Sequence, residues 1–137
     1  MLKRFLPLFI LFGLLTACSS SKDDGDWEAM KWKADTDMKE EKGSYVIDAE
    51  GATITFTCKN YSSPWIEGAR VGNNYIEPNR NSNDYKTLRG DWFSATITGN
   101  QLEVVVSRNT TQLARAFLLS VTAGDIFHTF QFVQKAP

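Results

Sequence analysis

Residues 52–59 read Ala-Thr-Ile-Thr-Phe-Thr-Cys-Lys, a regular alternation of apolar side chains with threonines. A period of two residues places the apolar side chains on one face of an extended strand and the threonines on the other. Threonine is β-branched and polar, so it suits the wet face of a sheet. The segment predicts a half-buried antiparallel strand, with Cys58 as a small buried apolar residue beside Ile54 and Phe56.

The same alternation recurs in the second half of the chain. Residues 101–107 repeat it, and a Gly-Asn turn joins them to a predicted strand at 91–97. A second hairpin is predicted from residues 114–122 and 126–134, because Gly124 between them tolerates the positive φ of a tight turn. These segments predict two antiparallel hairpins.

The rest of the chain carries weaker signals. Further strands are predicted at residues 28–33, 45–48, 64–66 and 71–76. The composition of residues 38–42 is compatible with a helix that Gly43 would end, and residues 60–90 are rich enough in Asn, Gly, Pro and Ser for long loops. About seven to eight short strands predict an all-β fold, an antiparallel β-sandwich. A closed barrel is the alternative, but it needs longer and more even strands.

The first 17 residues predict a secretory signal peptide. Lys3 and Arg4 precede an apolar run at residues 5–15, which is shorter than the roughly 20 residues of a membrane-spanning helix. The run leads into Leu-Thr-Ala and then Cys18, a motif that resembles the lipobox of bacterial lipoproteins. That resemblance implies cleavage before Cys18, attachment of diacylglycerol to its thiol, and membrane retention.

Residues 18–26 comprise the lipidated Cys18 and, after it, a predicted flexible acidic tether. The Ser-Lys-Asp-Asp run at 21–24 resembles the acidic export signal of Bacteroidetes surface lipoproteins. It implies an outer-membrane location with the domain facing the cell exterior. The remaining residues, 27–137, then form one domain with a single core.

Charge and cysteine content narrow the possible partners. Removal of the signal peptide takes away two of the 15 basic residues and none of the 16 acidic ones, which leaves a net negative chain. A nucleic-acid surface needs a basic patch, so no nucleic-acid partner is predicted. Besides Cys18 only Cys58 remains, so the exported domain must depend on its core rather than on a disulfide.

The order of several short motifs resembles a known family. Asn109-Thr-Thr leads through Arg115 into an alternating strand, a Gly124 turn, a second strand and the terminal Gln134. This order is similar to the C-terminal half of BACON-type domains, which are immunoglobulin-like modules of gut Bacteroidetes proteins.

Upstream, the resemblance extends to the Gly-containing stretch 49–52 and to the connection from Asn60 to Trp65. It covers residues 45–135, and it implies an immunoglobulin-like fold and an association with glycan-using surface proteins. Two segments depart from the family pattern, since 67–90 is longer and richer in Asn and 27–42 adds a strand.

The sequence offers little for catalysis. His128 is the only histidine, and it alternates in phase with Phe130 and Phe132, which places it at the end of a core face. No nucleophile elbow, P-loop, dinucleotide fingerprint or spaced set of metal ligands is present. We therefore predict no enzyme activity, no metal and no cofactor beyond the acyl lipid on Cys18.

The aromatic residues are the better candidates for function. Trp27 and Trp32 are an odd number of positions apart, so at least one should be exposed or packed against the tether, and Trp92 should face away from Phe93. Flat rings stack on the apolar faces of sugars while amides, carboxylates and guanidinium groups bind the hydroxyls. The candidate ligand-binding residues are Trp65, Tyr75, Tyr85, Asn73, Asn74, Arg80 and Asp84.

Two functions follow from these residues. The first is a non-catalytic cell-surface lipoprotein that binds glycan or another extracellular ligand through the loops around Trp65 and residues 73–85. The alternative is an accessory or spacer domain that recruits a protein partner and has no small ligand of its own. The same aromatic residues could also serve the core, and the sequence leaves that choice open.

Overall fold

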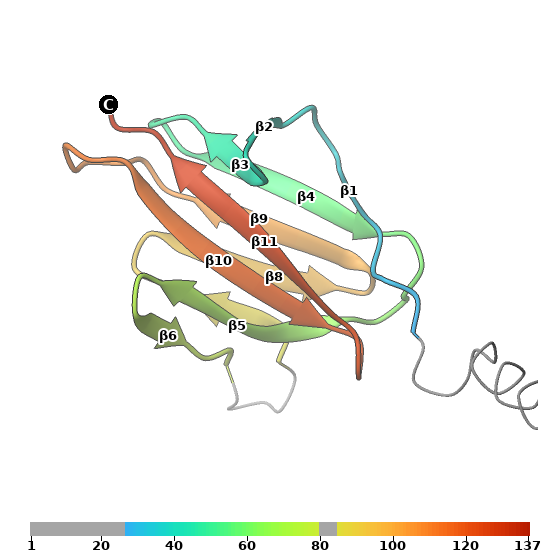
Figure 1. Ribbon diagram of the computed structural model, residues 1–137. Helices are drawn as coiled ribbons and strands as arrows, with labels where there is room; N and C mark the ends of the chain where they lie inside the picture. The colour runs from blue at the N-terminus through green and yellow to red at the C-terminus, as the bar shows by residue number, and fades with distance from the viewer. Residues whose placement is uncertain (1–26, 80–84) are drawn as a thin grey trace, which may run out of the picture.

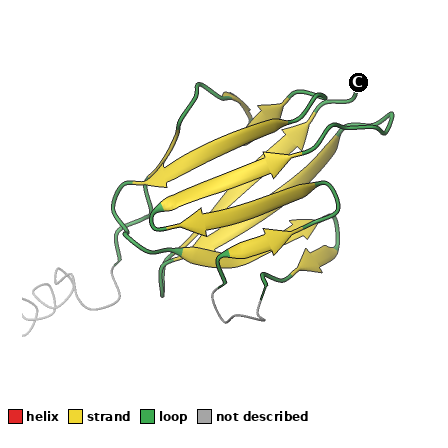
Figure 2. Cartoon of the chain, turned by 180° about the vertical axis from the view of Figure 1, so that it is seen from behind, coloured by secondary structure: helices red, strands yellow, loops and turns green. Residues whose placement is uncertain are grey.

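The computed structural model describes residues 27–79 and 85–137, and this part of the chain forms eleven strands and no helix. The strands make two sheets that pack face to face as a sandwich (Figures 1 and 2). The five-stranded sheet has the order β1 (Trp32–Ala34), β4 (Ala52–Cys58), β9 (Gln101–Val106), β8 (Phe93–Thr98) and β7 (Thr87–Arg89). The six-stranded sheet has the order β2 (Lys39–Glu41), β3 (Ser44–Ile47), β11 (Phe127–Gln134), β10 (Arg115–Thr122), β5 (Trp65–Val71) and β6 (Asn74–Ile76).

The prediction of an all-β sandwich is confirmed, with two differences. The described residues hold eleven strands rather than seven or eight. One pair is parallel, because β3 and the last strand β11 run in the same direction with Tyr45 opposite Phe132. The six-stranded sheet is therefore mixed and not purely antiparallel. This pairing places β3, from the N-terminal part of the domain, beside its last strand.

The strongly alternating segments form strands as predicted. They become β4, β8, β9, β10 and β11, within a residue or two of the predicted bounds. Both predicted hairpins are present, since β8 pairs with β9 and β10 pairs with β11 in antiparallel register. Cys58 is buried on the same face as Ile54 and Phe56, as expected.

Four weakly patterned segments differ from the prediction. Of the strand predicted at residues 28–33, only Trp32 and Lys33 belong to a strand, β1. Residues 39–41 form strand β2 and not a helix, because Lys42 (φ 52°) and Gly43 (φ 83°) are both left-handed and turn the chain back onto β3. Residues 87–89 form β7 inside the predicted loop region. The two short strands predicted around 64–76 are instead the long strand β5 and the short strand β6.

The alternation in β5 is hidden from the sequence by a register shift. Ile66 lies opposite Val121 and Gly68 lies opposite Ser120, so Glu67 has no residue opposite it in β10. An extra residue of this kind bends a strand and breaks the period of two. The pattern therefore reads as two fragments although the strand is continuous.

Five phenylalanine rings from both sheets lie in the core among a larger number of aliphatic side chains. Phe93 of one sheet stacks on Phe117 of the other with ring centroids 3.8 Å apart and an interplanar angle of 7°. Phe117 in turn stacks on Phe132 at 4.7 Å. The ring of Trp92 meets Phe117 edge-on at 5.2 Å, so the prediction that it faces away from the core is wrong. Trp92 precedes β8 and lies in a bend, where strand alternation does not apply.

All four edge strands are short. β1, β7, β2 and β6 each contain three residues. A short edge offers few unpaired backbone groups to another sheet, so it limits edge-to-edge association. The broad faces of the sandwich are thus better placed than its edges to meet a partner.

The first testable prediction concerns Gly51, which turns the chain from one sheet to the other. Its φ is 94°, and a Cβ at this position would lie 2.4 Å from the carbonyl oxygen of Val106. Gly43 has a similar φ of 83° but nothing within 4 Å of the same position. Gly43→Ala should cost about 1 kcal/mol of unfolding free energy through backbone strain alone. Gly51→Ala should cost at least about 2 kcal/mol more because the β4–β9 pairing must shift.

Urea denaturation of the two variants measures this difference directly. Gly43→Ala is the matched control, since it shares the left-handed backbone but has open space for the methyl group. Equal midpoints for the two variants would show that the close approach of Gly51 to β9 has no energetic importance.

Candidate functional site

The outer face of the six-stranded sheet carries most of the large exposed apolar side chains of the sandwich strands. Trp65 and Tyr75 lie on it with 37% and 45% of their surface exposed. Leu118 of β10 and Phe127 of β11 lie on the same face. Two of the predicted aromatic residues are therefore on one exposed surface.

Tyr75 is held in place on this face. Its hydroxyl donates a hydrogen bond of 2.8 Å to the carbonyl oxygen of Glu67. The ring lies against Gly68, where any Cβ would come within 2.2 Å of the tyrosine hydroxyl oxygen. The guanidinium of Arg70, directly opposite Tyr75 in the strand pairing, lies over the ring at 5.6 Å from its centroid. The ring is thus pre-positioned with a cation beside it.

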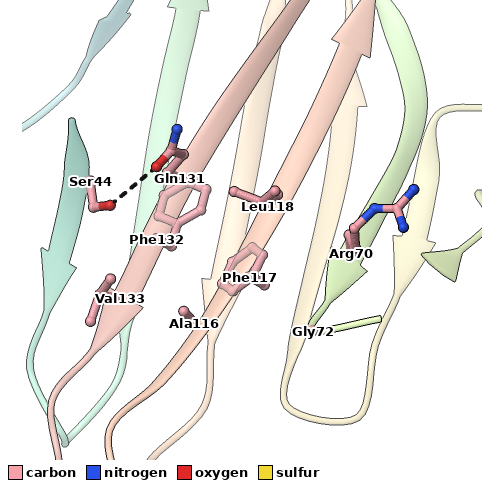
Figure 3. A pocket seen from close by; sticks show the side chains of 9 residues that line it. All are labelled: Ser44, Arg70, Gly72, Ala116, Phe117, Leu118, Gln131, Phe132 and Val133. Atoms are coloured by element: carbon pink, nitrogen blue, oxygen red, sulfur yellow. Dashed lines mark hydrogen bonds between the residues drawn. The ribbon is translucent and has the colours of Figure 1, made fainter. Parts of the chain in front are cut away.

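A shallow hollow of about 250 Å³ lies next to this pair, over β11 and β10 (Figure 3). Its floor includes the small or apolar side chains of Ala116, Leu118 and Val133, and Arg70 stands at one side. On the other side the Ser44 hydroxyl donates a 3.5 Å hydrogen bond to the Gln131 amide oxygen. Apolar floor and polar rim together provide both kinds of contact that a sugar ring uses.

A second hollow of about 620 Å³ continues the first one toward β2 and β3. Both are lined by Ser44 and Val133, so together they form one trough across the sheet, from Glu41 and Lys42 to Arg70. An elongated trough suits a chain-like ligand better than a compact one. We call this surface the sheet trough.

The remaining predicted site residues are divided between the two ends of β5. Asn73 and Asn74 are exposed at the turn into β6, near Arg70. Tyr85 lies at the other end, where its carbonyl oxygen accepts a 2.8 Å hydrogen bond from the Ile66 N–H. Its backbone is left-handed (φ 49°) and its side chain is half-buried. The structure therefore does not bring these residues together with Tyr85 into one loop cluster.

Three other predicted residues fall outside the described part of the chain. These are Arg80 and Asp84 of the candidate site, and the lipidation residue Cys18. Their assignments remain predictions from the sequence.

The motif residues at the end of the chain have a structural role. Gln134 is buried, and its amide nitrogen donates to the carbonyl oxygen of Ser107 at 2.8 Å and to those of Asp48 and Ala49 at 3.2 and 3.3 Å. Its amide oxygen accepts a 2.8 Å hydrogen bond from Arg115. Because these groups satisfy one another, they are not available to a ligand. We call this network the glutamine clamp.

Arg115 belongs to the glutamine clamp and also contacts the ring of Trp92. Its guanidinium lies 4.2 Å from the centroid of the Trp92 ring and also donates to the carbonyl oxygens of Ser107 and Arg108. Desolvation by burial lowers the pKa of Arg115 from its usual value. The cation–π contact and the carbonyl acceptors compensate that desolvation.

Asn109 shapes the loop between β9 and β10. Its buried side chain accepts from the backbone and hydroxyl of Thr111 and donates to the carbonyl oxygens of Leu113 and Lys135. The loop is therefore ordered by its own polar contacts. At its tip, the side chain of Leu113 is 76% exposed.

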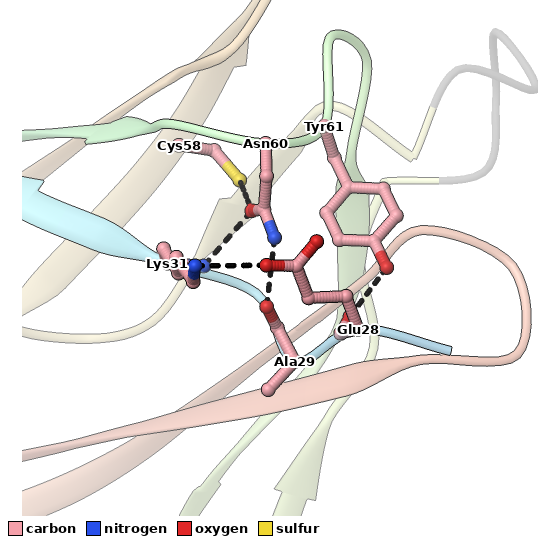
Figure 4. A network of polar contacts seen from close by, with 6 residues as sticks. All are labelled: Glu28, Ala29, Lys31, Cys58, Asn60 and Tyr61. Atoms are coloured by element: carbon pink, nitrogen blue, oxygen red, sulfur yellow. Dashed lines mark hydrogen bonds and ion pairs between the residues drawn. The ribbon is translucent and has the colours of Figure 1, made fainter. Parts of the chain in front are cut away.

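Asn60 has a structural role as well, at the opposite end of the sandwich (Figure 4). Its side chain donates to the carbonyl oxygen of Ala29 and accepts from the Lys31 N–H, at 2.8 and 3.0 Å. The Tyr61 hydroxyl donates to the carbonyl oxygen of Glu28. These contacts hold the segment 28–31 against the loop that follows β4, and we call them the strap contacts.

Comparison with known proteins gives a match among solved structures. No family model matches the sequence, and no curated protein matches it significantly. Among solved structures, the chain is similar to a protein from Bacteroides thetaiotaomicron determined by NMR, with a TM-score of 0.70 and 36% sequence identity. The match covers 88% of this chain and 98% of that chain. The chain belongs to the same family as this Bacteroides protein.

That family relationship concerns the whole domain and carries no assigned activity. The resemblance to BACON-type domains stays a prediction, as does the immunoglobulin-like topology. Within the described residues, no helix is long and apolar enough to cross a membrane.

His128 lies where its alternation with the core phenylalanines predicted. It is half-buried at the end of the core face, with its ring 4.6 Å from Phe130 and 6.5 Å from Trp32. Desolvation by burial lowers the pKa of its imidazole from the usual 6.5. It is surrounded by rings, which fits a packing role.

The second prediction follows from this lowered pKa. The unfolded chain binds the His128 proton more readily than the folded one, so unfolding becomes easier once protonation begins. The free energy of unfolding should hold its full value above pH 6.5 and fall as the pH drops through the lowered pKa of the folded state. Urea denaturation at a series of pH values measures the effect.

His128→Gln serves as the control, because it keeps a polar side chain of similar length but does not titrate. The variant should lose the pH dependence just below 6.5. An unchanged slope in this variant would assign that dependence to other groups.

Proposed function

We propose that the mature chain is a non-catalytic lipoprotein of the outer membrane, anchored through Cys18, whose domain binds glycan along the sheet trough. The motif that ends at Cys18 and the acidic run after it support the anchor and an exterior location. The family relationship to a Bacteroides protein is in keeping with both.

The observation that carries the glycan proposal is the composition of the sheet trough. An exposed, pre-positioned Tyr75 ring and the Arg70 guanidinium stand beside a floor of small apolar side chains. Sugar rings offer apolar C–H faces to such surfaces, and their hydroxyls can bond the amide and hydroxyl of Gln131 and Ser44. Trp65 adds a second exposed ring farther along β5 on the same face.

The loops of the sandwich are less suited to this task. At one end their polar groups are occupied by the glutamine clamp, and at the other by the strap contacts. A ligand would have to break these contacts to bind there. The outer face of the six-stranded sheet also carries internal contacts, such as those of Tyr75 with Glu67 and of Ser44 with Gln131, but they leave the rings of Trp65 and Tyr75 exposed.

The third prediction tests the sheet trough by filling it. Ala116 is exposed on its floor, so Ala116→Arg should block the trough without disturbing the core. Glycan-array binding of residues 27–137, followed by titration of hits through tryptophan fluorescence, should show a loss of about tenfold or more in affinity. Trp65→Ala and Tyr75→Ala should weaken binding in the same assay.

Thr53→Arg is the matched control, because Thr53 is exposed on β4 of the opposite sheet. It should bind as the wild type does. Undiminished binding by Ala116→Arg would exclude the sheet trough, whereas loss only in Trp65→Ala would move the site toward the start of β5. A folded wild-type domain without any hit would contradict the glycan proposal.

A second candidate function, recruitment of a protein partner, is favoured by Leu113. This side chain is the most exposed large apolar group in the described residues, and it stands on a loop ordered by Asn109 and Thr111. A rigid loop with an apolar tip loses little conformational freedom when it meets another protein.

The fourth prediction applies to this candidate. A stoichiometric protein should copurify with the lipoprotein after gentle detergent extraction, and Leu113→Ser should release it. Leu118→Ser, on the exposed sheet face, is the control that should retain the partner. A monodisperse monomer in the wild-type extract would contradict recruitment.

A further inference from the structure

Trp27 and Phe127 are the two most exposed aromatic side chains among the described residues, at 55% and 60%. They lie at the same end of the sandwich. Phe127 begins β11 directly after the turn from β10, and Trp27 stands one residue before Glu28, whose carbonyl oxygen accepts from Tyr61 in the loop that follows β4. Figures 1 and 2 both place the β10–β11 turn and the start of the described chain at this end.

The strap contacts determine where Trp27 leaves the domain. Asn60 binds the backbone of Ala29 and Lys31 on both sides of Met30, which is itself buried. Glu28 and Lys31 pair at 2.8 Å, so this short segment carries no unpaired charge of its own (Figure 4). Trp27 therefore leaves the domain at a fixed point beside an ion pair.

The length of chain before Trp27 limits how far this end can move from the proposed anchor. Nine positions separate Trp27 from Cys18. Even a fully extended chain of that length spans at most roughly 30 Å. The end that carries Trp27 and Phe127 must therefore stay close to the bilayer, while the Leu113 loop lies at the opposite end.

We infer that this end of the sandwich rests on the phospholipid bilayer, with the side chains of Trp27 and Phe127 in the interface between headgroups and acyl chains. The inference rests on the proposed lipidation of Cys18. Tryptophan prefers this interface because its ring is apolar and its N–H can still bond water or headgroups. Contact through two aromatic rings orients the domain, so that the sheet trough lies crosswise on its side, near the strand ends that are farther from the membrane, and the Leu113 loop points away from the membrane.

The test uses the full lipidated protein in vesicles of phosphatidylethanolamine and phosphatidylglycerol, with and without bromine on the acyl chains. Bromine quenches tryptophan fluorescence only at short range. The wild-type protein should be quenched, and Trp27→Phe should lose the larger part of that quenching. Trp32 and Trp92 pack against core rings, but Trp65 is 37% exposed and lies at this same end, on the other side of Thr122 from Phe127. The comparison is therefore made in a Trp65→Phe background, so that the exposed tryptophan it reports on is Trp27.

Two further variants sharpen the result. Phe127→Ser should reduce the quenching of Trp27, because the second contact with lipid is lost. Leu113→Trp in the Trp27→Phe background places a reporter at the opposite end, and it should add emission without adding quenching. Both positions are exposed, so neither change should affect folding.

The possible outcomes separate the two proposals. Equal quenching of wild type and Trp27→Phe, or strong quenching of the Leu113→Trp reporter, would overturn the orientation while leaving the anchor intact. A mature protein without acyl mass in mass spectrometry would overturn the anchor, and the orientation with it. Glycan binding by the trough variants is tested separately, and its outcome bears neither on the quenching of Trp27 nor on the acyl mass.

Discussion

The buried side chain of Gln134 connects backbone segments that no strand pairing joins. Its amide nitrogen reaches the turn after β3 and the residue after β9, and its amide oxygen receives Arg115 from β10. The carbonyl oxygens of Asp48 and Ala49 also accept from the N–H groups of Gly51 and Asn109, so Gln134 adds side-chain hydrogen bonds to a turn that is already joined to the next loop through its backbone. The glutamine clamp thereby closes one end of the sandwich, where the pairing of β4 with β9 also brings Gly51 close to Val106.

The opposite end of the sandwich is closed by the strap contacts. There Asn60 replaces missing strand pairing for the segment before β1 by bonding its backbone directly. With both ends occupied by internal contacts, the outer face of the six-stranded sheet is the surface on which Trp65, Tyr75 and Leu118 are exposed. The division of the aromatic residues agrees with this arrangement: phenylalanines from both sheets fill the interior, while Trp65 and Tyr75 face solvent.

The sequence predicted the strands that have one wet and one dry face. In β4, β9 and β11 burial follows the alternation of side chains along the strand, and in β10 it does so up to Val121, after which Thr122 is buried as well. The prediction from the sequence was wrong where contacts with other strands, and not the local pattern of side chains, determine the structure. β2 exists because a left-handed turn returns it to β3, and β5 is broken in pattern by the unpaired Glu67.

For the candidate site, the sequence determined which residue types could bind a sugar, and Trp65 and Tyr75 are indeed exposed on one face. It could not find the sheet trough, because Ser44, Arg70 and Gln131 come from three strands that are far apart along the chain. Nor could it separate Tyr85 from Asn73, which are close in sequence but lie at opposite ends of β5. A period of two residues encodes the two faces of each strand, whereas the order of strands in a sheet depends on which edges meet when the core closes.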